Sequence, residues 1–230
     1  MQEKKTVAII HTSFVFVNVE PVIKQMFTEI LPDVRIINIV DDTLLSDVVE
    51  AGEITPGVVQ RMTNHVQSAE QANADLIFSA CSSLGPALDI AKETAHVPVV
   101  KVDEAMAEKA VELGPRIGIL ATVPTTLAPT EQLILDTARR MNVQVTTTKS
   151  LAEGAFALLM GGQREQHNQR VLAQAQKLAQ SVDVIVLAQA SMAYLAASVE
   201  EQIGKPVLSS PRLGVERVRE KLAAQILSKK

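Results

Sequence analysis

Short apolar runs alternate with longer segments of helical period along the chain. The runs are rich in valine and isoleucine and hold few charges, which is typical of strands buried on both faces. Eight strands are therefore expected, at Val7–His11, Val34–Val40, Leu76–Ala80, Val97–Val102, Ile117–Ala121, Val143–Thr147, Val184–Ala188 and Pro206–Leu208.

Amphipathic segments separate these runs and predict helices. They lie at Val22–Ile30, Val58–Ala72, Glu104–Leu113, Glu131–Met141, Val171–Ala179 and Val215–Leu227. The last segment carries Val215, Val218, Leu222 and Ile226 at spacings of three and four, as a terminal helix would. Alternation of strands with helices favours the α/β class with parallel sheets.

The sequence also contains an internal repeat. Val7–Thr12 aligns with Ile117–Thr122, and Ala74–Leu84 aligns with Val182–Met192, which sets Cys81 opposite Gln189. The difference in residue number between the aligned segments is nearly the same for both alignments. One alignment alone would carry little weight, because any two buried strands can look similar. We therefore expect two similar αβα lobes related by a pseudo-twofold, the first made of residues 1–100 plus 208–230 and the second of 101–207.

Ligands of parallel α/β sheets bind outside the carboxyl ends of the strands. In a two-lobed protein these ends can face one active-site cleft. The strand ends supply Thr12-Ser13, Cys81-Ser82-Ser83, Thr122 and Gln189–Ser191. Residues 12–20 and 42–56 are expected to shape the pocket.

Composition narrows the class of protein. Hydrophobic residues make up 47% of the 230 and charged residues 21%, with a net charge of -4, as in soluble globular domains. There is no Trp and one Tyr, so the aromatic platforms of single-strand binders are absent and nucleic acid is not an expected partner. The single cysteine excludes an internal disulfide. The apolar stretch Val184–Ala197 is too short for a membrane span, and a cytoplasmic protein is expected.

Cys81 is the first candidate for chemistry, because it leaves a buried strand and enters a turn. Ser82 or Ser83 is expected to cap the following helix, whose early Pro86 suits a first turn. Unpaired N–H groups there favour the thiolate and can hold a substrate carboxylate. The alternative is a small apolar residue that ends a buried strand.

Other polar residues are open to two interpretations. Thr122, Thr125 and Thr126 could form a second anion cradle or make ordinary turn contacts. His11 could act as a general acid or base, bind a carboxylate or be structural. His65 and His167 are expected to be solvated, and His96 to point away from the cleft. The chain shows no metal-ligand cluster, GxGxxG or P-loop, so neither a metal nor an organic cofactor is expected.

Three segments, Ala80–Pro86, Ala121–Thr126 and Val184–Met192, resemble the aspartate/glutamate/hydantoin racemase superfamily over nearly the whole chain. The resemblance implies a cofactor-independent racemase or isomerase of a small carboxylic acid, acting as a homodimer. Most members carry one cysteine in each lobe, on opposite faces of the acidic carbon. Cys81 is then the catalytic cysteine. The implied substrate-binding residues are His11, Ser13, Ser82, Ser83, Thr122, Thr125, Thr126, Gln189 and Ser191.

This sequence departs from the family at Gln189, which stands where the second cysteine is expected. An amide does not shuttle protons near neutral pH. Three alternatives follow. Cys81 acts alone, as in a single-thiol decarboxylase or lyase or as the nucleophile of an isomerase. His11 or Tyr194 replaces the missing thiol. Or the protein is non-catalytic and binds a small acid.

Overall fold

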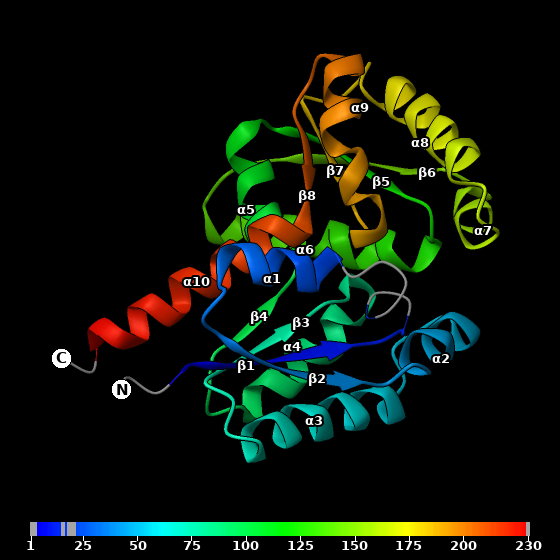
Figure 1. The fold of residues 1–230 in the computed structure, drawn as a ribbon. Helices are drawn as coiled ribbons and strands as arrows, with labels where there is room; N and C mark the ends of the chain where they lie inside the picture. Colours follow the sequence, from blue (N-terminus) through cyan, green and yellow to red (C-terminus); the bar gives the residue numbers. More distant parts are fainter. Residues whose placement is uncertain (1–3, 15–16, 18–21, 229–230) are drawn as a thin grey trace. The chain divides into compact units, whose positions relative to one another are not determined.

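The computed structural model describes residues 4–14, 17 and 22–228, and the chain divides into two compact units (Figure 1). The first is Met1–Val102 with Pro211–Lys230, and the second is Asp103–Ser210. Each unit is built on its own four-stranded parallel sheet with helices on both faces. The expected α/β class with two similar lobes is confirmed. Of the segment expected to shape the pocket, residues 15–16 and 18–20 lie outside the described residues.

The first sheet has the order β2-β1-β3-β4, from β1 (Thr6–His11), β2 (Arg35–Val40), β3 (Leu76–Ser79) and β4 (Val99–Lys101). One face packs on α1 (Val22–Ile30) and α10 (Ser210–Ser228), through a cluster that includes Phe27 and Val215. The other face packs on α2 (Leu44–Ala51), α3 (Pro56–Gln71) and α4 (Gly85–Ala91). The central strands are therefore buried on both sides, as their unbroken apolar runs require.

The second sheet repeats this order as β6-β5-β7-β8, from β5 (Arg116–Ala121), β6 (Thr146–Leu151), β7 (Val184–Leu187) and β8 (Val207–Ser209). The helices of this lobe are α5 (Glu104–Leu113), α6 (Leu127–Arg140), α7 (Ala155–Met160), α8 (Arg164–Leu178) and α9 (Ala196–Ile203). Apolar side chains of α8 and α9 join Leu120, Ile185 and Leu187 in one core.

The internal repeat extends to the strand register. Val7 pairs with Leu76 in the first sheet, and Ile117 pairs with Val184 in the second, which are the residues that the sequence alignment equates. A carboxylate clamps the amino end of each pair: Asp75 accepts from the Thr6 N–H at 2.8 Å, and Asp183 accepts from the Arg116 N–H at 3.0 Å. The same strand-pairing constraint thus acts in both lobes.

One strand was predicted in the wrong place. The run Val143–Thr147 was expected to be a strand, but β6 begins at Thr146 and extends to Leu151. This edge strand is TTTKSL, with exposed and half-buried side chains, so it lacks the apolar run by which buried strands are found. The short helices α2, α7 and α9 were not predicted, because fewer than three turns give little periodicity.

Gly214 tests how closely α10 packs on its sheet. A Cβ at this position would lie 2.6 Å from the carbonyl oxygen of Val102, which is backbone and cannot rotate away. We expect Gly214→Ala to lower the free energy of unfolding by about 1–3 kcal/mol through overpacking. Urea denaturation measures the change.

Gly57→Ala in α3 is the matched control, because its Cβ would meet nothing closer than 3.8 Å. Alanine there should leave stability unchanged or raise it by up to about 1 kcal/mol through helix propensity. Equal effects of the two substitutions would contradict close packing at Gly214.

Candidate active site

Cys81 stands immediately beyond the carboxyl end of β3. The preceding Ala80 still pairs with the neighbouring strand, since its N–H donates to the Ile10 carbonyl at 3.1 Å. Cys81 itself is extended, with φ -133° and ψ 117°, and opens a 3₁₀ turn over Ser82–Leu84. Its half-buried side chain packs against the core cluster that contains Ile10. The thiol is thus held at the edge of a rigid element.

The serine caps expected after Cys81 are not formed. The α-helix begins only at Gly85, its N-cap residue is Leu84, and no side chain caps it. The 3₁₀ turn intervenes, and the Gly85 N–H already bonds to the Ser82 carbonyl. Pro86 does lie in the first turn, as predicted. Ser82 is half-buried and Ser83 buried beside the thiol, so their placement near Cys81 comes from the turn and not from a cap.

His11 ends β1 and is buried, with Nε2 3.0 Å from Oδ1 of Asn38. Burial lowers the pKa of His11 below its ordinary value of 6.5, against the opposing effect of the Asn38 hydrogen bond. With the Asn38 oxygen as acceptor, Nε2 carries the proton of a neutral ring. Its Nδ1 has no partner in the described part of the chain.

Alternation of side chains separates His11 from Cys81. Val7 and Ile9 lie in one core cluster of the first lobe, and His11 is the next position on that side of β1. Cys81 packs on the opposite cluster, which holds Ala8 and Ile10.

Thr12 is the next position on the Cys81 side of β1. It is 2% exposed, and its hydroxyl oxygen finds no partner among the described residues. Ser13 follows and is half-buried. Thr12 is therefore the polar residue that follows β1 on the side of the thiol, whereas alternation places Ser13 on the side of His11.

The second lobe shows the most defined polar contact. The side-chain oxygen of Gln189 accepts from the Thr122 N–H at 2.6 Å, the Thr122 hydroxyl at 2.9 Å and the Val123 N–H at 3.1 Å. Two of these donors are backbone N–H groups, which cannot accept, so the amide orientation is fixed with oxygen toward them. The described residues contain no hydrogen bond from the amide nitrogen of Gln189.

Cys81 and Gln189 occupy equivalent places. Gln189 has φ -144° and ψ 138° and opens the 3₁₀ turn Ala190–Leu195, as Cys81 opens its own turn. Ala188 before it donates to the Leu120 carbonyl at 2.9 Å, just as Ala80 donates to Ile10. The residue after the strand has the same backbone setting in each lobe, and only its side chain differs.

The remaining candidates of the second lobe lie on the turns after β5 and β7. The Thr126 hydroxyl donates to the Val123 carbonyl at 2.8 Å, which is an ordinary turn contact. Thr125 is half-buried on the same turn. Ser191 is 2% exposed, and its hydroxyl has no partner in the region that the structure describes.

Tyr194, the candidate substitute for a second thiol, lies against α8. Its hydroxyl donates to Oδ1 of Asn168 at 2.6 Å, and the guanidinium of Arg164 covers its ring at 4.8 Å from the centroid. These contacts hold the phenol to the helix.

Two histidines differ from expectation. His167 was expected in solvent but is fully buried, with Nδ1 3.0 Å from Asn168 and its ring stacked on Tyr194. His65 is mostly covered and pairs with Asp41 at 2.9 Å. Both lie on helices where a polar sequence pattern masked a contact with another element. His96 is exposed, beside Glu70.

Neither a metal centre nor a membrane span is found in residues 4–14, 17 and 22–228. No three His, Cys, Asp or Glu side chains of this part gather as metal ligands. None of its helices combines the length and the apolar character that crossing a membrane requires.

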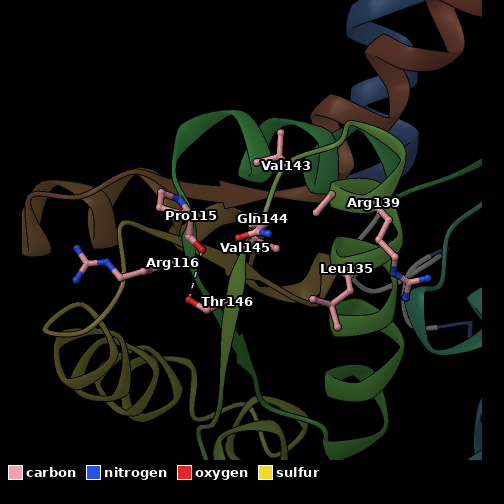
Figure 2. A pocket seen from close by; sticks show the side chains of 9 residues that line it. Pro115, Arg116, Leu135, Arg139, Val143, Gln144, Val145 and Thr146 are labelled. Atoms are coloured by element: carbon pink, nitrogen blue, oxygen red, sulfur yellow. Dashed lines mark hydrogen bonds between the residues drawn. The ribbon is translucent and has the colours of Figure 1, made fainter.

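A hollow of about 690 Å³ lies elsewhere, at the amino ends of β5 and β6 (Figure 2). Pro115, Arg116 and Thr146 line it at the strand starts, and Leu135 and Arg139 line it from α6. Thr122 follows the carboxyl end of β5 and Gln189 follows that of β7, at the opposite edge of the same sheet, so the hollow is separate from the candidate site.

Each of the two lobes is an α/β unit with a parallel sheet and with polar side chains beyond its central strands. The chain belongs to the Asp/Glu/Hydantoin racemase family, whose model matches residues 17–218. None of the curated proteins matches it.

Solved structures share the fold at low sequence identity. Glutamate racemase from Francisella tularensis, in complex with D-glutamate, has a TM-score of 0.72 and 15% identity over 97% of this chain and 83% of its own. Allantoin racemase from Klebsiella pneumoniae has a TM-score of 0.69 and 19% identity over 96% and 89%. Family membership supports a racemase-type enzyme that acts on a small molecule, and these neighbours show that the fold is shared.

Sequence reasoning did not find the contact between Gln189 and Thr122. A signal was present, because the alignment sets both residues just after paired strands, and alternation places them on the same side as Leu120 and Leu187. What the sequence does not contain is the side-chain rotamer that directs the amide oxygen to the backbone donors.

Burial of a neutral His11 predicts a dependence of stability on pH. The pKa of His11 in the folded protein lies below its ordinary value of 6.5, which applies to the unfolded chain. Between these two pKa values the unfolded chain therefore binds more protons than the folded protein does. The contribution of the neutral, buried His11 to the free energy of unfolding is then fully present above pH 6.5. It is lost as the pH falls toward the folded-state pKa, by at most about 1.4 kcal/mol per pH unit. We expect His11→Gln, which keeps a donor for Asn38, to flatten the profile of unfolding free energy directly below pH 6.5.

His96→Gln on an exposed side chain is the control for removing an imidazole. A His11→Gln profile as steep as that of the unmodified protein would contradict a buried neutral His11.

Proposed function

We propose that the protein is a cofactor-independent racemase or isomerase of a small carboxylic acid, with the Cys81 thiol as its acid–base group. The observation that supports this most directly is the place of Cys81. It is the only thiol of the chain, and it stands beyond a buried parallel strand at the position that its lobe shares with Gln189. Family membership gives the reaction class.

The proposed step is a proton transfer at the carbon next to the carboxylate. The Cys81 thiolate removes the proton, the C–H electron pair moves into the carboxylate, and an enediolate and a thiol result. Return of the proton by the Cys81 thiol regenerates the substrate, whereas delivery of a proton from solvent to the opposite face of the same carbon gives the other enantiomer. A thiol suits this role because cysteine titrates near pH 8.5, within reach of neutral pH.

The negative charge that develops on the enediolate needs hydrogen-bond donors in place before the reaction. In the first lobe we assign this role to Ser13, Ser82 and Ser83, which lie on the segments after β1 and β3. In the second lobe the candidates are Thr125, Ser191 and Gln189, because the Thr126 hydroxyl already donates to the Val123 carbonyl. Thr122 is a weaker donor to substrate, because its N–H and hydroxyl both bond to Gln189.

Gln189 favours a second candidate function. An amide neither removes nor returns a proton near neutral pH, so chemistry by Cys81 alone would act on one face of the carbon. A decarboxylase or lyase needs only one proton donor after the carbon–carbon bond breaks. The two candidates differ in product, because a one-faced reaction gives a single enantiomer.

We expect Cys81→Ala and Cys81→Ser to lose turnover by orders of magnitude, since alanine has no acidic proton and serine is a far weaker acid. Proton NMR in deuterated water, with amino acids, hydantoins, hydroxy acids and substituted malonates and no added cofactor, measures exchange and product. Because Cys81 is the only cysteine, alkylation by iodoacetamide should remove the same activity from the unmodified protein.

Ser181→Ala, on a turn at the far end of β7, is a control for surface substitution. Activity that persists in Cys81→Ala would exclude the thiol as the acid–base group. Ligand-dependent thermal stabilisation with neither exchange nor product would instead indicate a binding protein.

Gln189→Cys should create or raise racemisation of a bound acid, because it places a second titratable thiol where the lobes are equivalent. Gln189→Ser is the matched control, since it shortens the side chain without adding a useful acid. Chiral chromatography of the product distinguishes the two. Equal racemisation by both variants would contradict the role assigned to position 189.

A further inference from the structure

Three hydrogen-bond donors converge on one point in the second lobe, and Gln189 occupies that point. Its oxygen lies within 3.1 Å of the Thr122 N–H, the Thr122 hydroxyl and the Val123 N–H. Successive backbone N–H groups directed at one position form a concave site suited to an anion. The neutral amide oxygen of Gln189 accepts from these donors, but it carries less negative charge than a carboxylate oxygen, which would form stronger hydrogen bonds with them.

The filling of this site depends on the side chain at position 189. Thr12 of the first lobe aligns with Thr122, is equally buried, and has a hydroxyl oxygen without a partner among the described residues. Cys81 aligns with Gln189 and carries no oxygen to place there. Within the described residues, the Thr12 hydroxyl therefore lacks the side-chain acceptor that Gln189 gives to the Thr122 hydroxyl.

We propose that Gln189 closes an anion-binding site formed by Thr122 and Val123 and is thereby a specificity-determining residue. A ligand group near position 189 meets the amide N–H donors of Gln189 instead of the three converging donors. One neutral amide donor binds a second carboxylate less tightly than two backbone N–H groups and a hydroxyl do. The protein then favours acids that carry a neutral acceptor, such as a carbonyl or amide, at that position over dicarboxylic acids.

The inference that Gln189 fills the anion site depends only on hydrogen bonds within the second lobe. The inferred substrate preference, in contrast, rests on the proposed function. Gln189 is nine-tenths buried, and its oxygen is fixed by donors that cannot accept. The amide nitrogen consequently points away from these donors. This orientation makes Gln189 a donor to a ligand and not an acceptor.

The direct test empties the site and offers it a small anion. In Gln189→Ala, the melting temperature should rise saturably with sodium formate at constant ionic strength set by sodium gluconate, whose anion is much bulkier than formate. The unmodified protein should show a smaller rise, because only the carboxylate-binding groups outside the filled site remain open to formate. Gln189→Ala combined with Thr122→Val removes one donor and should bind formate at least about tenfold more weakly.

A second variant keeps the test decisive if the alanine variant does not fold. Gln189→Glu preserves the length of the side chain and places a carboxylate among the three donors. Its folded-state pKa should be depressed, so the gain in melting temperature is present above the unfolded pKa near 4.3 and is lost as pH falls through the folded value. Gln189→Glu that is no more stable than the unmodified protein at pH 7 would overturn the proposal, as would equal formate responses of the alanine variant and the unmodified protein.

Substrate preference is tested where exchange or turnover is measured. Gln189→Ala should raise the ratio of kcat/KM for a dicarboxylic acid to that for the matching monoamide by about tenfold or more. An unchanged ratio would remove the specificity role. Formate binding is read without any reaction, so failure of the proposed thiol chemistry and failure of the closed anion site give different results.

Discussion

Parallel pairing of two buried central strands in each lobe determines where every candidate side chain lies. β1 pairs with β3 and β5 pairs with β7 in the same register, and a carboxylate holds the amino end of each pair. Once that register is set, the strands end together. Thr12 and Cys81 then follow one pair and Thr122 and Gln189 follow the other. A slip by one residue would turn each of these side chains to the opposite face.

The register also explains why polar groups are tolerated at these positions. Backbone pairing continues through Ala80 and Ala188, so the chain leaves the sheet with its hydrogen bonds satisfied up to the last residue before the candidate. A 3₁₀ turn follows at once in both lobes and keeps residues 81 and 189 extended. The side chain at that point can vary from thiol to amide without a change in the backbone. Function can therefore differ between the lobes while the fold is preserved.

Features that depend on the burial of apolar residues, such as the central strands, were predicted from the sequence. Features that depend on contacts between residues distant in sequence were predicted less well. Seven buried or partly buried strands and the repeat were placed from apolar runs, because strands covered on both faces must be apolar. The polar edge strand β6 was displaced by a few residues, since its exposed Thr146 and Lys149 carry no such constraint. His167 was misjudged because helical polarity does not reveal a neighbour such as Tyr194, which is distant in sequence.

For the candidate site too, the positions of residues along the strands could be predicted, whereas their side-chain contacts could not. The position of Cys81 beyond a strand could be predicted, but the serine caps could not, because a 3₁₀ turn and an α-helical turn have similar sequence signals. The environment of Gln189 depends on a rotamer that only packing selects. The resemblance to the racemase family predicted that Gln189 stands where a second cysteine is expected, and the structure adds that its amide oxygen has three hydrogen-bonding partners.

Side-chain length connects the two roles assigned to position 189. The amide oxygen of glutamine lies further from the backbone than the sulfur of a cysteine would, so a thiol at this position does not reach the donors that Gln189 engages. A cysteine there would supply a proton carrier and also leave the converging donors open to a ligand anion. A glutamine supplies neither. In the proposed function, one residue thus couples proton transfer on the second face to the binding of charge in the second lobe, and a change of chemistry at this position would change the preferred substrate as well.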